Sequence, residues 1–219
     1  MTATTAPDFR VLADVPRLEA LPGVTLRLLV LAADGGQCAG VETASGALVR
    51  AWSAAPPPRL APYDLVEVTV GGDADALPDP CQPEGVVCAS APEPVGHLRG
   101  RQVERLLRPL LHPGDTPLLG LHGPAVPFWE RRPDSPSIAV VETRGPVQLR
   151  REGSYLACRF WWQGAQRELA CLDRARAAAM DRAGITRATA PKGVRLVVAL
   201  TPPIDGHCHK VVEAVLPHP

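Results

Sequence analysis

Proline and glycine interrupt this chain so often that many short strands joined by turns are favoured over a bundle of long helices. The 219 residues include 25 Pro and 19 Gly, about a fifth of the chain, against a usual share of about 12%. Apolar residues make up 46%, so the chain as a whole is predicted to fold. The sequence therefore predicts a mostly-β protein, with Pro and Gly placed in its turns.

Apolar and alternating runs in the first part of the chain predict a group of about five short strands. Asp34-Gly35-Gly36 turns the chain after the first run, and Ala44-Ser45-Gly46 lies between two runs that read as a hairpin. Pro56-Pro57-Pro58 prevents regular pairing and marks a loop. The predicted strands span residues 24–32, 37–43, 47–53, 63–70 and 85–89.

The clearest helix is predicted over residues 96–111, between the two strand-rich parts. Leucines at 106, 107, 110 and 111 form an apolar stripe, and Pro109 is expected to end or kink the helix. Arg101, Arg105 and Arg108 fall at i, i+4 and i+7 and therefore share one side. This side is either a binding surface or simply the solvated face of a connecting helix.

The second part of the chain repeats the first in outline, with a short helix inserted. Residues 173–183 predict that helix, because Asp173 can cap its start and Gly184 can close its end. A hairpin is expected about Gln163-Gly164-Ala165. The predicted strands span 137–143, 147–150, 155–162, 166–171, 195–201 and 208–216.

Five or six short strands with one helix match the oligonucleotide/oligosaccharide-binding (OB) fold, a small Greek-key barrel. Composition does not separate this fold from an SH3-like barrel or a small sandwich. We expect two small OB-like antiparallel barrels joined by a short helix. The expected division is a flexible lead over 1–22, a first barrel over 23–94, a linker helix and Pro/Gly-rich crossing over 95–135, and a second barrel over 136–219.

Five short motifs stand out along the chain. They are Gly36-Gln37-Cys38-Ala39-Gly40, Val49-Arg50-Ala51-Trp52-Ser53, Tyr63-Asp64-Leu65-Val66-Glu67-Val68, Gln82-Pro83-Glu84 and Gly206-His207-Cys208-His209-Lys210. These motifs resemble those of the bacterial dual OB-containing domain family, and the resemblance covers roughly residues 24–216. It implies two fused OB-like barrels and an association with nucleic acid, but no catalytic mechanism. The sequence departs from the family in two respects: His207 and His209 occupy positions where the family usually has tyrosine, and the linker helix is rich in arginine.

Formal charge is zero overall but is sorted along the chain. Residues 1–94 hold 5 Arg and 12 acidic residues, a balance of −7, whereas residues 95–200 hold 17 basic and 9 acidic residues, a balance of +8. Such polarity favours contact of the second half with an acidic partner. It equally allows an acidic first module to meet a basic surface, on a protein partner, on another copy or within the same molecule.

No motif that carries a known chemistry is present, so we predict a protein without catalysis of its own and without a cofactor. His207 and His209 share a strand face and are weak metal candidates, since zinc usually needs four ligands, or three and a water. The first 22 residues have neither a basic start nor a long apolar run, which predicts no export signal and a cytoplasmic location. The six scattered cysteines are then expected to stay reduced.

Aromatic side chains beside arginines are the candidate sites for stacking unpaired bases. Phe160 and Trp162 should face the core, which leaves Trp161 outside beside Arg159. Trp52 beside Arg50 is the comparable pair in the first module. We therefore predict weakly sequence-specific binding of single-stranded nucleic acid, with protein interaction as the alternative. The predicted contacts are Arg101, Arg105, Arg108, Arg150, Arg159, Trp161, Arg50 and Trp52.

Overall fold

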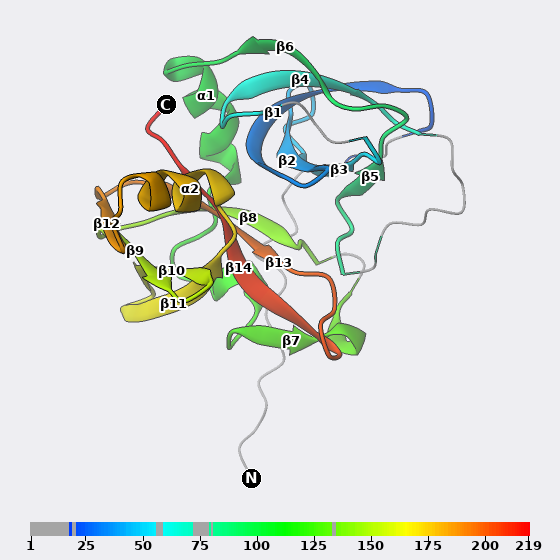
Figure 1. Cartoon of the computed structure of the whole chain (residues 1–219). Helices are drawn as coiled ribbons and strands as arrows, with labels where there is room; N and C mark the ends of the chain where they lie inside the picture. Colours follow the sequence, from blue (N-terminus) through cyan, green and yellow to red (C-terminus); the bar gives the residue numbers. More distant parts are fainter. Residues whose placement is uncertain (1–17, 19–20, 56–58, 72–78, 80, 133–134) are drawn as a thin grey trace.

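In the computed structural model the protein is mostly β, and its described residues form two sheets and two short α-helices (Figure 1). The structure describes residues 18, 21–55, 59–71, 79, 81–132 and 135–219. The mostly-β class predicted from the sequence is confirmed. The predicted flexible lead over 1–22 lies almost wholly outside the described residues.

The first sheet contains six strands in the order β5-β3-β2-β1-β4-β6. Its centre is the long strand β1, which pairs with β2 on one side and β4 on the other, both antiparallel. Strands β3 and β5 run parallel, and a bridge between Val70 and Cys88 joins the ends of β4 and β5. The strands are β1 (Thr25–Asp34), β2 (Gln37–Glu42), β3 (Leu48–Trp52), β4 (Asp64–Thr69), β5 (Gly85–Val87) and β6 (Glu93–His97).

The second sheet contains strands in the order β12-β9-β10-β11-β14-β13-β8, and the short strand β7 pairs with β14. All its pairings are antiparallel except β11 with β14. Only residues 143–146 separate β8 from β9, although β8 lies at one end of the sheet. The strands are β7 (Ala125–Pro127), β8 (Ile138–Glu142), β9 (Val147–Glu152), β10 (Tyr155–Trp162), β11 (Ala165–Cys171), β12 (Arg187–Ala190), β13 (Arg195–Leu200) and β14 (His207–Leu216).

Helix α1 (Arg101–Leu107) is shorter than the predicted helix over 96–111, so its predicted start was wrong. Residues 93–97 instead form β6, which extends the first sheet past the predicted boundary at residue 94. Gly100, with φ +51°, ends the extended segment before the helix, and a 3-10 turn over Arg108–Leu110 follows at the expected proline. Of the predicted apolar stripe, Leu107 and Leu110 are buried, whereas Leu106 and Leu111 are half-buried; Val103 is buried beside them.

Helix α2 (Arg174–Arg182) confirms the helix predicted over 173–183 and is one residue shorter at each end. The Asp173 side chain accepts a hydrogen bond from the Arg176 backbone N–H at 2.9 Å, which satisfies one of the free amides at the helix start. Gly184 takes φ +63°, the left-handed conformation that closes a helix at low cost in glycine. Two further 3-10 turns lie at Leu118–Gly120 and Phe128–Glu130.

The two sheets share a hydrophobic core, so the two modules form one packed unit. Leu31 and Val41 of the first sheet lie in the same buried cluster as Val140, Val197 and Leu216 of the second. Polar groups also cross this boundary: the Glu84 carboxylate accepts hydrogen bonds from the Ser137 backbone N–H and hydroxyl. The Tyr63 hydroxyl donates to the Pro217 carbonyl at 2.6 Å.

All six cysteines are buried with free thiols. Burial raises the pKa of Cys38, Cys81 and Cys171 to about 12, which keeps these thiols protonated and unreactive at neutral pH. In the described part of the chain, no helix is long and apolar enough to cross a membrane.

Candidate nucleic-acid interface

Three neighbouring strands of the second sheet, β12, β9 and β10, present a basic outer face. Alternation along β10 buries Phe160 and Trp162 and leaves Trp161 half exposed, as predicted. On β9 the same alternation buries Leu149 and turns Arg150 outward. The outer face therefore carries arginine and tryptophan side chains on a rigid antiparallel scaffold.

Arg150 of β9 lies directly opposite Arg187 of β12. Like charges in directly opposed positions on a sheet destabilise it unless a counter-charge lies between them. Arg150 has only a long contact with Glu152, at 3.4 Å, and among the described residues Arg187 has no acidic partner. Both side chains line a hollow of about 250 Å³ together with Arg159. The structure thus gathers three guanidinium groups around one surface depression.

Arg159 is less available than the other two arginines. It lies opposite Glu168 of β11 and forms a close ion pair with that carboxylate, which raises the pKa of Arg159. The Glu168 charge therefore offsets part of the positive field on the β11 side. The free positive charge of this face is concentrated on β9 and β12.

Trp161 stands at the edge of a second hollow, of about 410 Å³, next to Arg144. Its side chain is 50% exposed, and Gly145 approaches it so closely that a Cβ at that position would lie 3.4 Å from the indole ring. Arg144 has no acidic partner among the described residues. An exposed indole beside an unpaired guanidinium can stack a base and bind its phosphate.

The predicted arginines of α1 and of the 3-10 turn that follows it are all exposed, and ion pairs connect α1 to the rim of the second hollow. Glu104 of α1 forms an ion pair with Arg195 at 2.8 Å, and Arg195 also pairs with Glu142 at 3.2 Å. Glu142 in turn lines the hollow beside Trp161. The hydrogen bond from Arg195 lowers the pKa of Glu104. The exposed arginines are Arg101, Arg105 and Arg108.

The predicted site in the first module is wrong, because Arg50 is fully buried. Its guanidinium pairs with Glu213 of β14 at 2.6 Å and joins the two sheets. Trp52, on the same side of β3, is only partly exposed and lies beside Gly85 of β5. An arginine in a strand has the same appearance in the sequence whether it meets solvent or a second module. Only the packing of the two sheets against each other shows that Arg50 meets the second module and not solvent.

Comparisons with known proteins leave the family open. No family model matches the chain, and no curated protein matches it. Among solved structures, the chain is similar to the p204 HINb domain, at 9% sequence identity and a TM-score of 0.31, with 89% of this chain and 100% of that chain covered.

An exposed aromatic cluster, which we did not predict from the sequence, lies beside His207 at the start of β14. Phe128 and Trp129 are 46% and 64% exposed, and their ring centroids lie 5.3 Å apart. The Trp129 ring reaches His207, whose ring lies 6.5 Å from that of His209. Within the described ranges, no group of three or more His, Cys, Asp or Glu side chains is placed to hold a metal ion.

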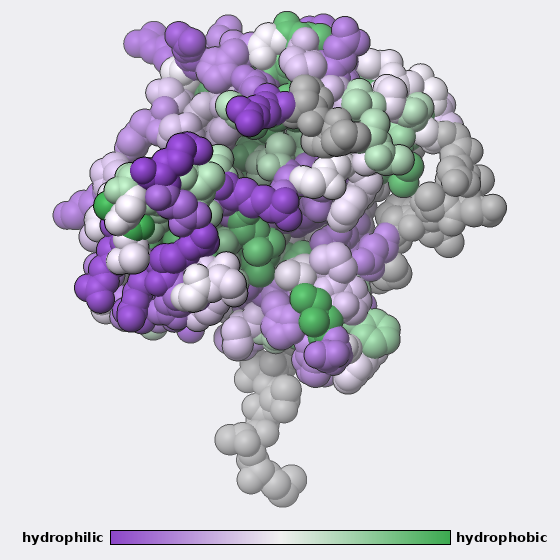
Figure 2. Space-filling view, in the orientation of Figure 1, coloured by the Kyte–Doolittle hydropathy of each residue, from purple (hydrophilic) through white to green (hydrophobic). Residues whose placement is uncertain are grey.

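Hydrophilic side chains gather over α2, β12 and β9 in the view of Figure 2, on the left of the molecule.

We did not predict Arg144 and Arg187 as contact residues, because the sequence shows only that they lie in the basic half of the chain. Their surroundings and the depressions around them depend on the fold.

Proposed function

We propose that this protein binds single-stranded nucleic acid, with low sequence specificity and without catalysis, on the outer face of β12, β9 and β10. The observation that carries the proposal is the opposed pair Arg150 and Arg187 on the same side of the sheet as the exposed Trp161. Phosphate groups would offset the repulsion between the two guanidinium groups, and the indole would stack a base.

We further propose that each sheet is an OB-like barrel, as the resemblance to the dual OB-containing family implies. The bridge between the ends of β4 and β5 supports this for the first sheet. In the second sheet, β8 pairs with β13 and β9 pairs with β10, as two halves of one bent strand would. Strands β10 and β11 then take the second and third positions, so the proposed face shares β10 with the face that binds oligonucleotides in OB folds and extends from it over β9 and β12.

The proposal predicts strongly salt-dependent binding. Each phosphate neutralised on a single strand contributes about −0.7 to the slope of log K against log salt. Replacing three contacting arginines by glutamine should therefore flatten this slope by about 2 and weaken binding at low salt. The variant to measure combines Arg144→Gln, Arg150→Gln and Arg187→Gln.

The experiment is fluorescence anisotropy with a labelled oligothymidine of about 12 nucleotides, a length within the usual range for an OB fold. A matched control removes the same charge elsewhere, with Arg27→Gln, Arg59→Gln and Arg174→Gln. Binding that is lost in the first triple variant and kept in the control supports the proposal. Equal binding by the two variants, or no binding by the wild-type protein at low salt, refutes it.

Protein interaction is the second proposal, and the exposed cluster of Phe128, Trp129 and Ile204 favours it. Large apolar side chains exposed together mark interaction surfaces. The acidic first module is a weaker candidate for this role, because Asp34 already pairs with Arg174 of α2 at 2.9 Å within one molecule. Light scattering across a salt series distinguishes self-association from a monomer at every ionic strength.

A further inference from the structure

A cavity at the end of the second sheet contains a buried lysine, for which the described part of the chain provides no acidic partner. Lys210 of β14 is only 6% exposed, and its Nζ donates hydrogen bonds to the backbone carbonyls of Leu121 and Gly123, at 2.5 and 2.8 Å. An ammonium group has three N–H donors, so these two carbonyls leave one free. The cavity has a volume of about 260 Å³ and lies between β11, β14 and the segment 117–124.

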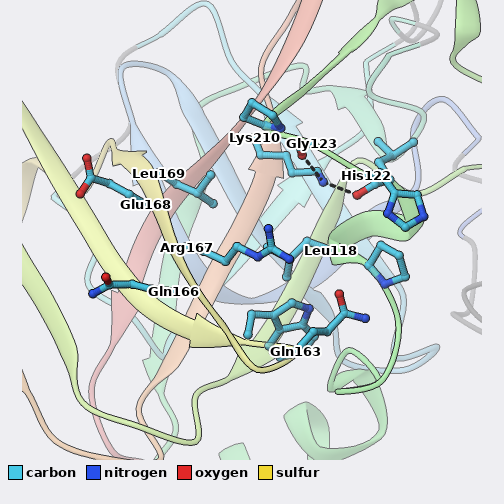
Figure 3. A pocket seen from close by; sticks show the side chains of 13 residues that line it. Leu118, His122, Gly123, Gln163, Gln166, Arg167, Glu168, Leu169 and Lys210 are labelled. Carbon is cyan, nitrogen blue, oxygen red and sulfur yellow. Dashed lines mark hydrogen bonds between the residues drawn. The ribbon is translucent and has the colours of Figure 1, made fainter. Parts of the chain in front are cut away.

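Arg167 of β11 adds a second positive charge to the same cavity. Figure 3 shows its guanidinium directed toward Lys210, and among the described residues Arg167 has no acidic partner. Glu168 borders the cavity, but in Figure 3 its carboxylate is directed away from both cations, and it pairs with Arg159 on the outer face. Two cations thus face one partly open cavity, and no acidic side chain of the described residues lies between them.

This arrangement disfavours the charged form of the lysine. Burial, with the Arg167 charge as a smaller cause, lowers the pKa of Lys210 from 10.5 to about 8. The remaining wall is mixed: Leu118, Leu169 and Trp162 are apolar, whereas His122, Gln163 and Gln166 are polar. A buried charge is usually paired, and partial burial strengthens any charge–charge contact made there relative to bulk water.

We propose that this cavity is an oxyanion site that binds a phosphate group between Lys210 and Arg167. The guanidinium offers a planar pair of donors to two phosphate oxygens, and the lysine offers its third N–H to another. The cavity is smaller than most drug-sized ligand pockets, which run from about 300 Å³ upward, so it suits a phosphate on a small group. The proposal does not depend on nucleic-acid binding.

The phosphate has two chemical sources: a small phosphorylated molecule, or the end of a nucleic-acid strand. Trp162 and Gln163 line both this cavity and the hollow beside Trp161, so a strand on the basic face would end close to the cavity. The test therefore needs inorganic phosphate as one probe and a pair of oligothymidines, with and without a 5′-phosphate, as another.

The first arm titrates inorganic phosphate into the full chain by isothermal calorimetry at constant ionic strength, with chloride as the reference anion. We expect saturable binding that weakens at least about tenfold in Arg167→Gln, because a charge-assisted bidentate contact is lost. Arg59→Gln is the matched control and should bind as the wild type does. Arg167 is exposed, so its replacement leaves the fold intact, whereas Lys210→Met is only a supporting variant.

The second arm identifies the source. A 5′-phosphate that tightens oligothymidine binding about tenfold in the wild type, but not in Arg167→Gln, assigns the cavity to strand ends. Saturable phosphate binding with equal affinity for the two oligothymidines assigns it to a small phosphorylated molecule. The absence of saturable phosphate binding, or binding unchanged in Arg167→Gln, overturns the proposal. If the wild-type protein binds inorganic phosphate but no oligothymidine, the proposed function is refuted and the phosphate site stands.

Discussion

Breaking the buried ion pair between Arg50 and Glu213 should be one of the most destabilising single changes in this protein. Arg50 is fully buried, the Glu213 side chain is 14% exposed, and their charged atoms lie 2.6 Å apart. Removing one partner of a buried pair usually costs about 3–5 kcal/mol, because the other charge stays behind uncompensated. Because Glu213 keeps some contact with solvent, we expect Arg50→Met to lower the free energy of unfolding by about 3 kcal/mol, the lower end of that range.

Urea unfolding followed by circular dichroism measures this loss as a shift of the midpoint at constant slope. The double variant Arg50→Met with Glu213→Leu removes both charges and should recover most of the stability, since apolar replacement of a whole buried pair is often neutral. A loss below about 1 kcal/mol in Arg50→Met would refute the reasoning. So would a double variant whose loss equals the sum of the two single losses, because uncoupled residues do not form a pair.

Three further predictions follow from named contacts. Asp173→Ala should cost about 1–2 kcal/mol of unfolding free energy in urea, because the carboxylate caps α2 and also accepts the Val215 N–H at 3.0 Å; Asp173→Asn should cost less. Folding lowers the pKa of Lys210 from 10.5 to about 8, so the folded protein loses this proton at a lower pH than the unfolded chain does. The free energy of unfolding of the wild type, relative to that of Lys210→Met, should therefore rise by roughly 3 kcal/mol between pH 8 and pH 10.5. A flat difference contradicts that shift. Trp161→Ala should weaken oligothymidine binding by about 1–3 kcal/mol, with an unchanged urea midpoint; intact affinity would exclude stacking there.

Most of the secondary structure was predictable because turns and alternation are local signals. Strand β10 was predicted at its exact bounds, and the cap at Asp173 was identified from its residue type alone. The strands that were missed, β6, β7 and β12, are short, and each is held by a partner far away in the sequence. Pairing across the fold, rather than propensity, makes these segments extended.

The candidate site was predictable only in part. The outward orientation of Trp161 followed from strand alternation, because its neighbours had to face the core. The burial of Arg50 did not follow from any local pattern, since its partner Glu213 lies 163 residues away. The cavity at Lys210 likewise requires three segments that only the fold brings together. Local periodicity sets the direction of a side chain, and tertiary packing decides what the side chain meets.

The most direct test of the nucleic-acid proposal is to map the contact on the protein. Amide hydrogen exchange of the full chain, measured with and without oligothymidine at low salt, reports which strands the ligand protects. Binding on the outer face of β12, β9 and β10 should slow amide exchange over residues 147–162 and 187–190, with little change in β1 to β5. Protection confined to the first sheet, or no change anywhere at saturating oligothymidine, would contradict it.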